Sequence, residues 1–210
     1  MGVITKGLIT KSIIAPSIPV YITSTVNTPF TSVATVSQTP VSPLTPGDLM
    51  ISVISTTSAS AVTWTPPAGW TEVVDQGASP NLHISWKIAT SSETAAVWTP
   101  STTVTGIAII IGFRNALLDV VGTTATPATG TNSFTVPAIT TTVNNAIVVL
   151  ITAGSAHNGV NGVSNWTNIN FQFNTAVVQA QYKVQATAGT TGTVSYSFSS
   201  GSGNGTGVLI

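Results

Sequence analysis

Residues able to do acid, base or nucleophilic chemistry are scarce in this sequence. Its 210 residues include two histidines, five acidic residues and no cysteine. Glu72 and Asp75 form its one close pair of carboxylates, and a glycosidase needs such a pair facing a common cleft at roughly 5–9.5 Å. On a regular strand, however, positions three apart point to opposite faces. We therefore expect no paired acid catalysis from Glu72 and Asp75.

The two histidines lie in unpromising surroundings. His83 falls on the polar side of an expected strand, and His157 falls in an expected loop. Neither belongs to a metal-ligand spacing such as HxH or HxxxH, and no GxSxG element supplies a nucleophile. We expect surface or turn histidines, no bound metal or cofactor, and no enzymatic activity. A hydrolase would need a concave cluster that joins His83 or His157 to a carboxylate.

Tryptophans offer a different chemistry, because their rings can stack on sugars. Trp70, Trp86 and Trp166 are expected to fill the core. Trp64, beside two prolines, and Trp98, before Pro100, are the better surface candidates. Together with the 154–166 loop they give a set of candidate ligand or partner contacts. These are Trp64, Trp98, His157, Asn158 and Asn161.

The sequence contains an internal repeat. Trp70-Thr71 aligns with Trp166-Thr167, and Trp86-Lys87 aligns with Tyr182-Lys183, both at an offset of 96 residues. A fixed offset over two segments predicts duplicated supersecondary structure. The chemically interesting positions do not repeat, since Glu72 and His83 correspond to Asn168 and Gln179. A specific site should therefore lie in what the two copies do not share.

The domain organisation follows from the repeat and from the composition. We expect an extended N-terminal arm over residues 1–44 and a β-sandwich over residues 45–210. The sandwich comprises repeat one (45–114), a connector (115–143) with a strand at 133–136, and repeat two (144–210). Short Thr- and Val-rich stretches bounded by Gly and Pro predict an all-β fold, an antiparallel sandwich or jelly roll.

Period-two alternation predicts which side chains face inward. Leu82, Ile84, Trp86 and Ile88 share one face of a strand, as do Val178, Ala180, Tyr182 and Val184 in the matching strand. We expect the opposite faces, which carry His83, Ser85 and Lys87 or Gln179, Gln181 and Lys183, to be solvated. Ile107–Ile111 and Ala146–Ile151 are apolar on both faces. Their second face is covered either by the connector or N-terminal arm, or by another subunit.

The low charge of the chain limits the classes of partner that it can bind. The formal net charge is zero and only 5% of residues are charged, against about 25% in an ordinary domain. Such a chain does not attract phosphates, so we expect no nucleic-acid binding. Its apolar runs are too short to span a bilayer, which needs about 20 residues, so we expect no membrane partner. Weak charge protection suits a protein held at high local concentration in an assembly.

Four segments resemble a recurring β-sandwich domain of tailed-bacteriophage virion proteins. They are Pro46-Gly47-Asp48-Leu49, Pro66-Pro67-Ala68-Gly69-Trp70-Thr71, Trp86-Lys87-Ile88-Ala89, and Ile107–Phe113 followed by Arg114-Asn115-Ala116. The resemblance covers about residues 45–210, and a second, weaker copy follows the first in that family too. It implies a non-enzymatic virion component, either a capsid decoration (cement) protein or part of a tail or fibre.

The sequence thus gives a preferred function and an alternative. The preferred one is a capsid decoration protein at the virion surface, made in the bacterial host cytoplasm and bound to other virion proteins and to itself as a homo-oligomer. Its N-terminal arm would dock by strand addition to a neighbour. The expected docking residues are Val3, Ile4, Leu8, Ile9, Ile13 and Ile14. The alternative is a tail- or fibre-associated module that binds a receptor or a host surface glycan.

Overall fold

The fold is an all-β sandwich, as expected. The computed structural model describes residues 18–26, 29–40, 42–58, 60–77, 79–90, 93–125, 130–157, 159–199, 201 and 203–210. Within these ranges the regular elements are all β-strands and no helix is present. Abundant Val, Ile and Thr favour strands, and frequent Gly and Pro keep the strands short.

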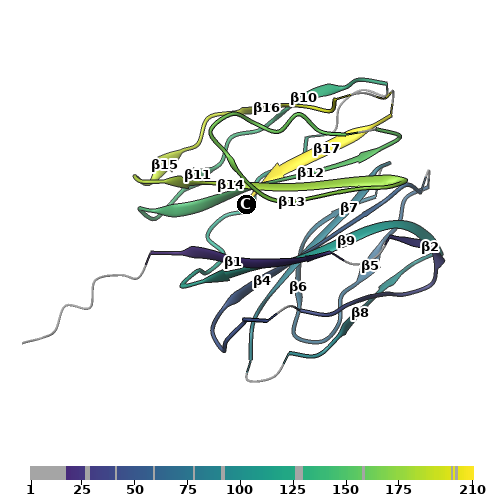
Figure 1. The fold of residues 1–210 in the computed structure, drawn as a ribbon, viewed down its shortest axis with the longest axis horizontal. Helices are drawn as coiled ribbons and strands as arrows, with labels where there is room; N and C mark the ends of the chain where they lie inside the picture. The colour runs from purple at the N-terminus through teal and green to yellow at the C-terminus, as the bar shows by residue number, and fades with distance from the viewer. Residues whose placement is uncertain are drawn as a thin grey trace, which may run out of the picture.

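The first half of the chain builds a lobe of two layers (Figure 1). Its larger sheet has the order β1-β9-β4-β7-β6, and β2 also pairs with β9. These strands are β1 (Val20–Val26), β2 (Phe30–Val33), β4 (Leu49–Thr56), β6 (Thr71–Gln76), β7 (Asn81–Ile88) and β9 (Val104–Arg114). A smaller sheet, in the order β3-β8-β5, contains β3 (Val36–Gln38), β5 (Trp64–Thr65) and β8 (Ala96–Pro100).

The second half builds a similar lobe. Its larger sheet has the order β13-β14-β12-β17, and two strand pairs, β10-β16 and β11-β15, lie outside it. The strands are β10 (Ser133–Val136), β11 (Thr140–Thr141), β12 (Ala146–Ser155), β13 (Thr167–Phe173), β14 (Ala176–Gln185), β15 (Gly189–Thr190), β16 (Val194–Ser197) and β17 (Gly205–Leu209). The strand expected at 133–136 is therefore confirmed.

The two larger sheets are connected alike. The order β9-β4-β7-β6 in one lobe corresponds to β17-β12-β14-β13 in the other, strand for strand along the chain. The covering pairs also correspond, because β3-β8 and β10-β16 occupy the same places in the chain order. This topology is what a duplication would produce, although the duplication itself stays a prediction. The strands β1 to β3 belong to the first lobe, so the sandwich begins before residue 45.

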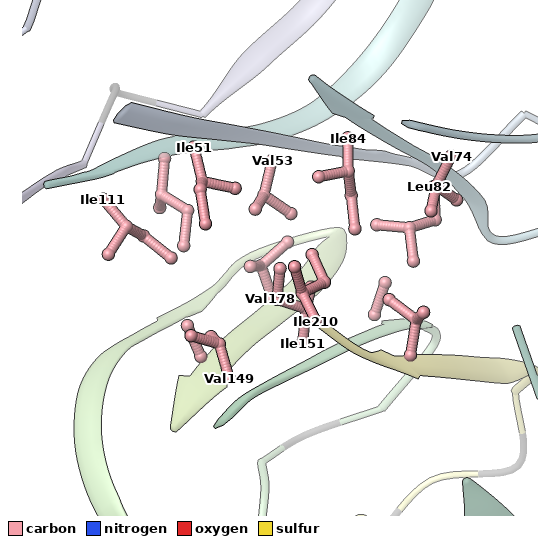
Figure 2. Packing of buried hydrophobic residues seen from close by; sticks show 14 of the residues in the cluster. Ile51, Val53, Val74, Leu82, Ile84, Ile111, Val149, Ile151, Val178 and Ile210 are labelled. Atoms are coloured by element: carbon pink, nitrogen blue, oxygen red, sulfur yellow. The ribbon is translucent and has the colours of Figure 1, made fainter. Parts of the chain in front are cut away.

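A central core joins the lobes where the larger sheets face each other. Side chains such as Ile51, Ile84 and Ile111 project from one sheet towards Val149, Ile151 and Val178 of the other (Figure 2). Trp86 and Tyr182 pack at its margin, half-buried, so their expected inward direction is confirmed.

One outer core lies on the other side of each large sheet. In the first lobe Trp64, Trp70 and Trp98 are packed against Met50 and Ile110 of the sheet. In the second lobe a matching outer core contains Phe134, Val136, Val148, Leu150, Tyr196 and Phe198. β9 and β12 are apolar on both faces because each lies between the central core and an outer core. Strand β3 from the N-terminal region and β10 from the connector contribute to these covers, as the first of the two alternatives proposed, together with β5, β8 and β16.

The expectation of solvated polar faces on β7 and β14 is wrong. His83, Ser85, Gln179 and Gln181 are buried, because the covering strands lie over them. The covering strands also supply polar partners for these residues. Trp98 Nε1 donates to Ser85 Oγ (3.0 Å), and Tyr196 Oη donates to Gln179 Oε1 (2.9 Å). The polar residues of these strands therefore face an outer core, and the apolar residues face the central core.

Asp48 organises the turn that leads into β4. Its Oδ2 accepts hydrogen bonds from Thr45 N (2.8 Å) and Thr45 Oγ1 (3.0 Å), which confirms the expected turn-forming role. Arg114 at the end of β9 also donates to both carboxylate oxygens. The guanidinium of Arg114 is the main reason that the pKa of Asp48 lies below its ordinary value.

Shortening Ile151 to valine tests the central core. Ile151 lies in the middle of β12 and is fully buried between the lobes. Ile151→Val removes one methylene and should lower the free energy of unfolding by about 0.5–1.5 kcal/mol, measured by urea denaturation. Val184→Ala, at a half-exposed position, should change it much less. Equal effects at the two positions would contradict the burial of Ile151.

Candidate functional site

A β-bulge in β6 brings the acidic pair together. Glu72 lies opposite Ser85 and Val74 lies opposite Ile84, so Val73 is an extra residue in the register. An extra residue on one strand shifts the following side chains to the other face. Glu72 and Asp75 therefore share the outer face of the sheet with His83, which lies opposite Asp75. The prediction that the two carboxylates point to opposite faces is wrong, because it assumed a regular strand.

His83 is the buried member of this cluster. Its exposed fraction is 0%, and its Nδ1 lies 3.5 Å from Glu72 Oε2. The Trp64 ring covers it, with ring centroids 5.6 Å apart, and neither imidazole nitrogen has a hydrogen-bond partner among the described residues. The backbone N–H of Trp64 donates to Asp75 Oδ2 (3.3 Å), which holds β5 over the cluster.

Burial sets the protonation states. It lowers the pKa of His83 to about 4, so the imidazole is neutral at pH 7. Burial also raises the pKa of Glu72, and the nearby charge of Asp75 raises it further. The pKa of Asp75 is raised by burial, against the opposing effect of the Trp64 N–H. The expectation of a surface histidine at position 83 is wrong.

Glu72 and Asp75 are exposed, but His83 is not. A general base must come within hydrogen-bond reach of its substrate, and His83 has no exposed surface. Ser85, its neighbour on the same face, is also buried and accepts a hydrogen bond from Trp98. Among the residues that the structure describes, no group of three or more His, Cys, Asp or Glu side chains is placed to hold a metal ion. His83 therefore cannot contact a substrate in this arrangement.

The two candidate surface tryptophans are interior residues. Trp64 is 6% exposed and Trp98 is 0% exposed, because β5 and β8 turn these rings towards the large sheet. Trp98 packs edge-on against Trp70, with ring centroids 4.9 Å apart. The expectation that Trp64 and Trp98 lie at the surface is wrong, and a glycan-binding module loses its main stacking residues. Trp70 is in the core as expected, and Trp166 is half-buried against the second outer core.

The 154–166 loop is also less open than expected. His157 is buried and stacks on Phe198, with ring centroids 3.8 Å apart, so its expected surface position is wrong. Asn161 is exposed, and its Nδ2 donates to Ser197 Oγ and to the Phe198 carbonyl oxygen. Asn158 lies outside the described residues. The docking residues expected in the arm lie outside them too, namely Val3, Ile4, Leu8, Ile9, Ile13 and Ile14.

A cavity lies at one end of the central core. Its volume is about 420 Å³, within the range of about 300–1,000 Å³ typical of ligand pockets. Leu49, Ile51 and Phe113 line it from the first lobe, and Ile147 and Val149 line it from the second. The C-terminal residue, which also lines it, lies between the lobes (Figure 1). The cavity is thus a gap where the two larger sheets separate.

The mouth of this cavity is apolar. Leu117 is 79% exposed and Val143 is 52% exposed, and both line the cavity. Val184, also half-exposed, pairs with the lining residue Ile147. Pro19, close to the first described residue, lines it as well. We call this mouth, with Pro19, Leu117, Val143 and Val184, the apolar end.

Sequence reasoning missed this site because it treated residues 115–143 as a linker. A signal was present, since Ala116-Leu117-Leu118 and Val120-Val121 are apolar outside any strand. Apolar residues in a connector indicate a segment that lines or covers something. Asp119, between them, is fixed by accepting hydrogen bonds from the backbone N–H and hydroxyl of Thr142.

The chain has no match among known protein families, curated proteins or solved structures. Within the described residues no helix is long and apolar enough to cross a membrane.

Proposed function

We propose that the protein is a non-enzymatic structural protein of a tailed-bacteriophage virion, a capsid decoration protein docked through its N-terminal arm and the apolar end. The resemblance of the segments around Pro46, Pro66, Trp86 and Ile107 to virion β-sandwich domains suggests the class. The low charge and the buried state of His83 agree with a structural role.

The apolar end is the observation that carries the proposal. Exposed aliphatic side chains gathered around a cavity are typical of an interaction surface, whereas single exposed apolar residues are common and indicate no such surface. The N-terminal segment joins the sandwich at this same end, beside Pro19. A docking arm and a docking surface would therefore face the same neighbour in the particle.

Purified particles test this proposal. We expect the protein to sediment with intact virions and to remain on capsids after tails are removed. Its absence from purified particles would refute the proposal, and its recovery with tails alone would favour a tail location.

A surface variant locates the contact. Leu117→Lys with Val143→Lys should lower occupancy on particles at least about tenfold, because two aliphatic side chains lose their burial. Val97→Lys, on the covering sheet at an exposed position, is the matched control and should bind normally. Equal loss in both variants would contradict docking through the apolar end.

A further inference from the structure

We propose that residues 8–14 of the chain bind in the cavity at the apolar end of the same molecule. The segment reads Leu8-Ile9-Thr10-Lys11-Ser12-Ile13-Ile14 and lies outside the described residues. This intramolecular contact goes beyond the proposed function and does not depend on it.

The cavity fits an aliphatic segment. Its lining is dominated by Leu, Ile, Val, Ala and Phe side chains. A volume of about 420 Å³ is enough for several water molecules. Water in such an apolar space has few polar partners, so filling it with Leu and Ile side chains is favourable. The segment supplies four aliphatic residues, Leu8, Ile9, Ile13 and Ile14.

The chain enters the described structure at the mouth of the cavity. Pro19 lines it, and Ile14 precedes Pro19 by five residues. Five residues reach up to roughly 17 Å when extended, enough to bring Ile13 and Ile14 over the mouth. The sequence Ala15-Pro16-Ser17-Ile18 also favours a reversal, because proline is preferred at the second position of a β-turn. A turn there would direct the preceding residues back towards Leu117 and Val143.

Charge is compatible with this occupant. Asp119 is the one charged residue among the described residues that line the cavity. It is exposed, and the segment carries Lys11 between its two aliphatic pairs. A lysine in the middle of the segment can thus reach a carboxylate at the mouth, while the aliphatic residues on either side enter the cavity.

A short connection favours the same chain over a second copy. A segment tethered by a few residues has an effective concentration in the millimolar range. A second copy at micromolar concentration competes poorly with it. The contact would cover the exposed side chains of Leu117 and Val143 in the free protein, and it would have to open before the arm and the apolar end could both dock to a neighbour.

Disulfide trapping tests the contact on the full chain. The protein has no cysteine, so Ile13→Cys with Val143→Cys introduces a single possible pair, and Val143 is half-exposed. We expect rapid oxidation of the double variant to an intramolecular disulfide in monomeric protein, seen by peptide mapping without reductant. Ile13→Cys with Val97→Cys is the control, because Val97 is 44% exposed on the far, covering sheet.

The outcomes separate the alternatives. Oxidation on the order of tenfold faster for the 13–143 pair than for the 13–97 pair supports the proposal. Equal rates overturn it. An equally rapid 13–143 disulfide between two mixed single variants also overturns it, because the occupant would then be a second copy. The assay uses purified protein, so it is independent of whether the protein is found on particles.

Discussion

Trp98→Ala is expected to lower the free energy of unfolding by about 3–5 kcal/mol, the range for large-to-small changes of buried aromatic residues. Trp98 is fully buried in the first outer core and packs edge-on against Trp70. Its Nε1 donates to Ser85 Oγ, so the substitution also leaves a buried hydroxyl without its donor. Urea denaturation followed by tryptophan fluorescence, with circular dichroism as a second probe, measures the change.

Two further variants sharpen this result. Trp98→Phe keeps most of the volume and loses the hydrogen bond, so its effect should be smaller than that of alanine. Val97→Ala, the adjacent exposed position, should be nearly neutral. If Trp98→Ala were also nearly neutral, the ring would have to be exposed, and a role in ligand stacking would return.

Acid is expected to destabilise the protein through His83. Its pKa is about 4 in the folded protein, against an ordinary value of 6.5. Between these values the unfolded chain binds more protons, so stability is complete above pH 6.5 and falls as the pH drops towards 4. The loss approaches about 3 kcal/mol at the acid end. The raised pKa values of Glu72 and Asp75 act in the opposite direction and reduce the net loss.

Denaturation series at pH 7, 5.5 and 4 measure this dependence. His83→Gln removes the titrating group and should flatten the profile over this range. Glu72→Gln should steepen it, because the protonated imidazole loses the carboxylate 3.5 Å away. An unchanged profile in His83→Gln would show that His83 does not carry the acid sensitivity.

Much of the fold was predictable because strand signals are local. The alternation in residues 82–88 and 178–185 predicted two strands and their inward residues, and the apolar runs in β9 and β12 predicted strands covered on both sides. The placement of Trp64, Trp98, His83 and His157 was not predictable. It depends on the covering strands, which come from distant parts of the chain and supply polar partners for buried polar groups.

The candidate sites could not be predicted from the sequence for the same reason. The proximity of Glu72 and Asp75 results from one extra residue, Val73, whose position in the register has no local signal in the sequence. The cavity arises where two sheets diverge, and its lining combines residues from both lobes and the connector. Local pattern predicts neither feature, because each depends on how separate segments meet.

The pairing of β1 and β2 with β9 has a consequence for synthesis of the chain. Among the described strands, both pair only with β9, roughly 80 residues later. At translation rates of about 5–20 residues per second, they wait on the order of 4–16 s with unpaired backbone groups. Nascent chains are therefore most open to wrong strand pairing, and to capture by chaperones, until Val104–Arg114 has left the ribosome. Slower translation just before β9 would lengthen that interval.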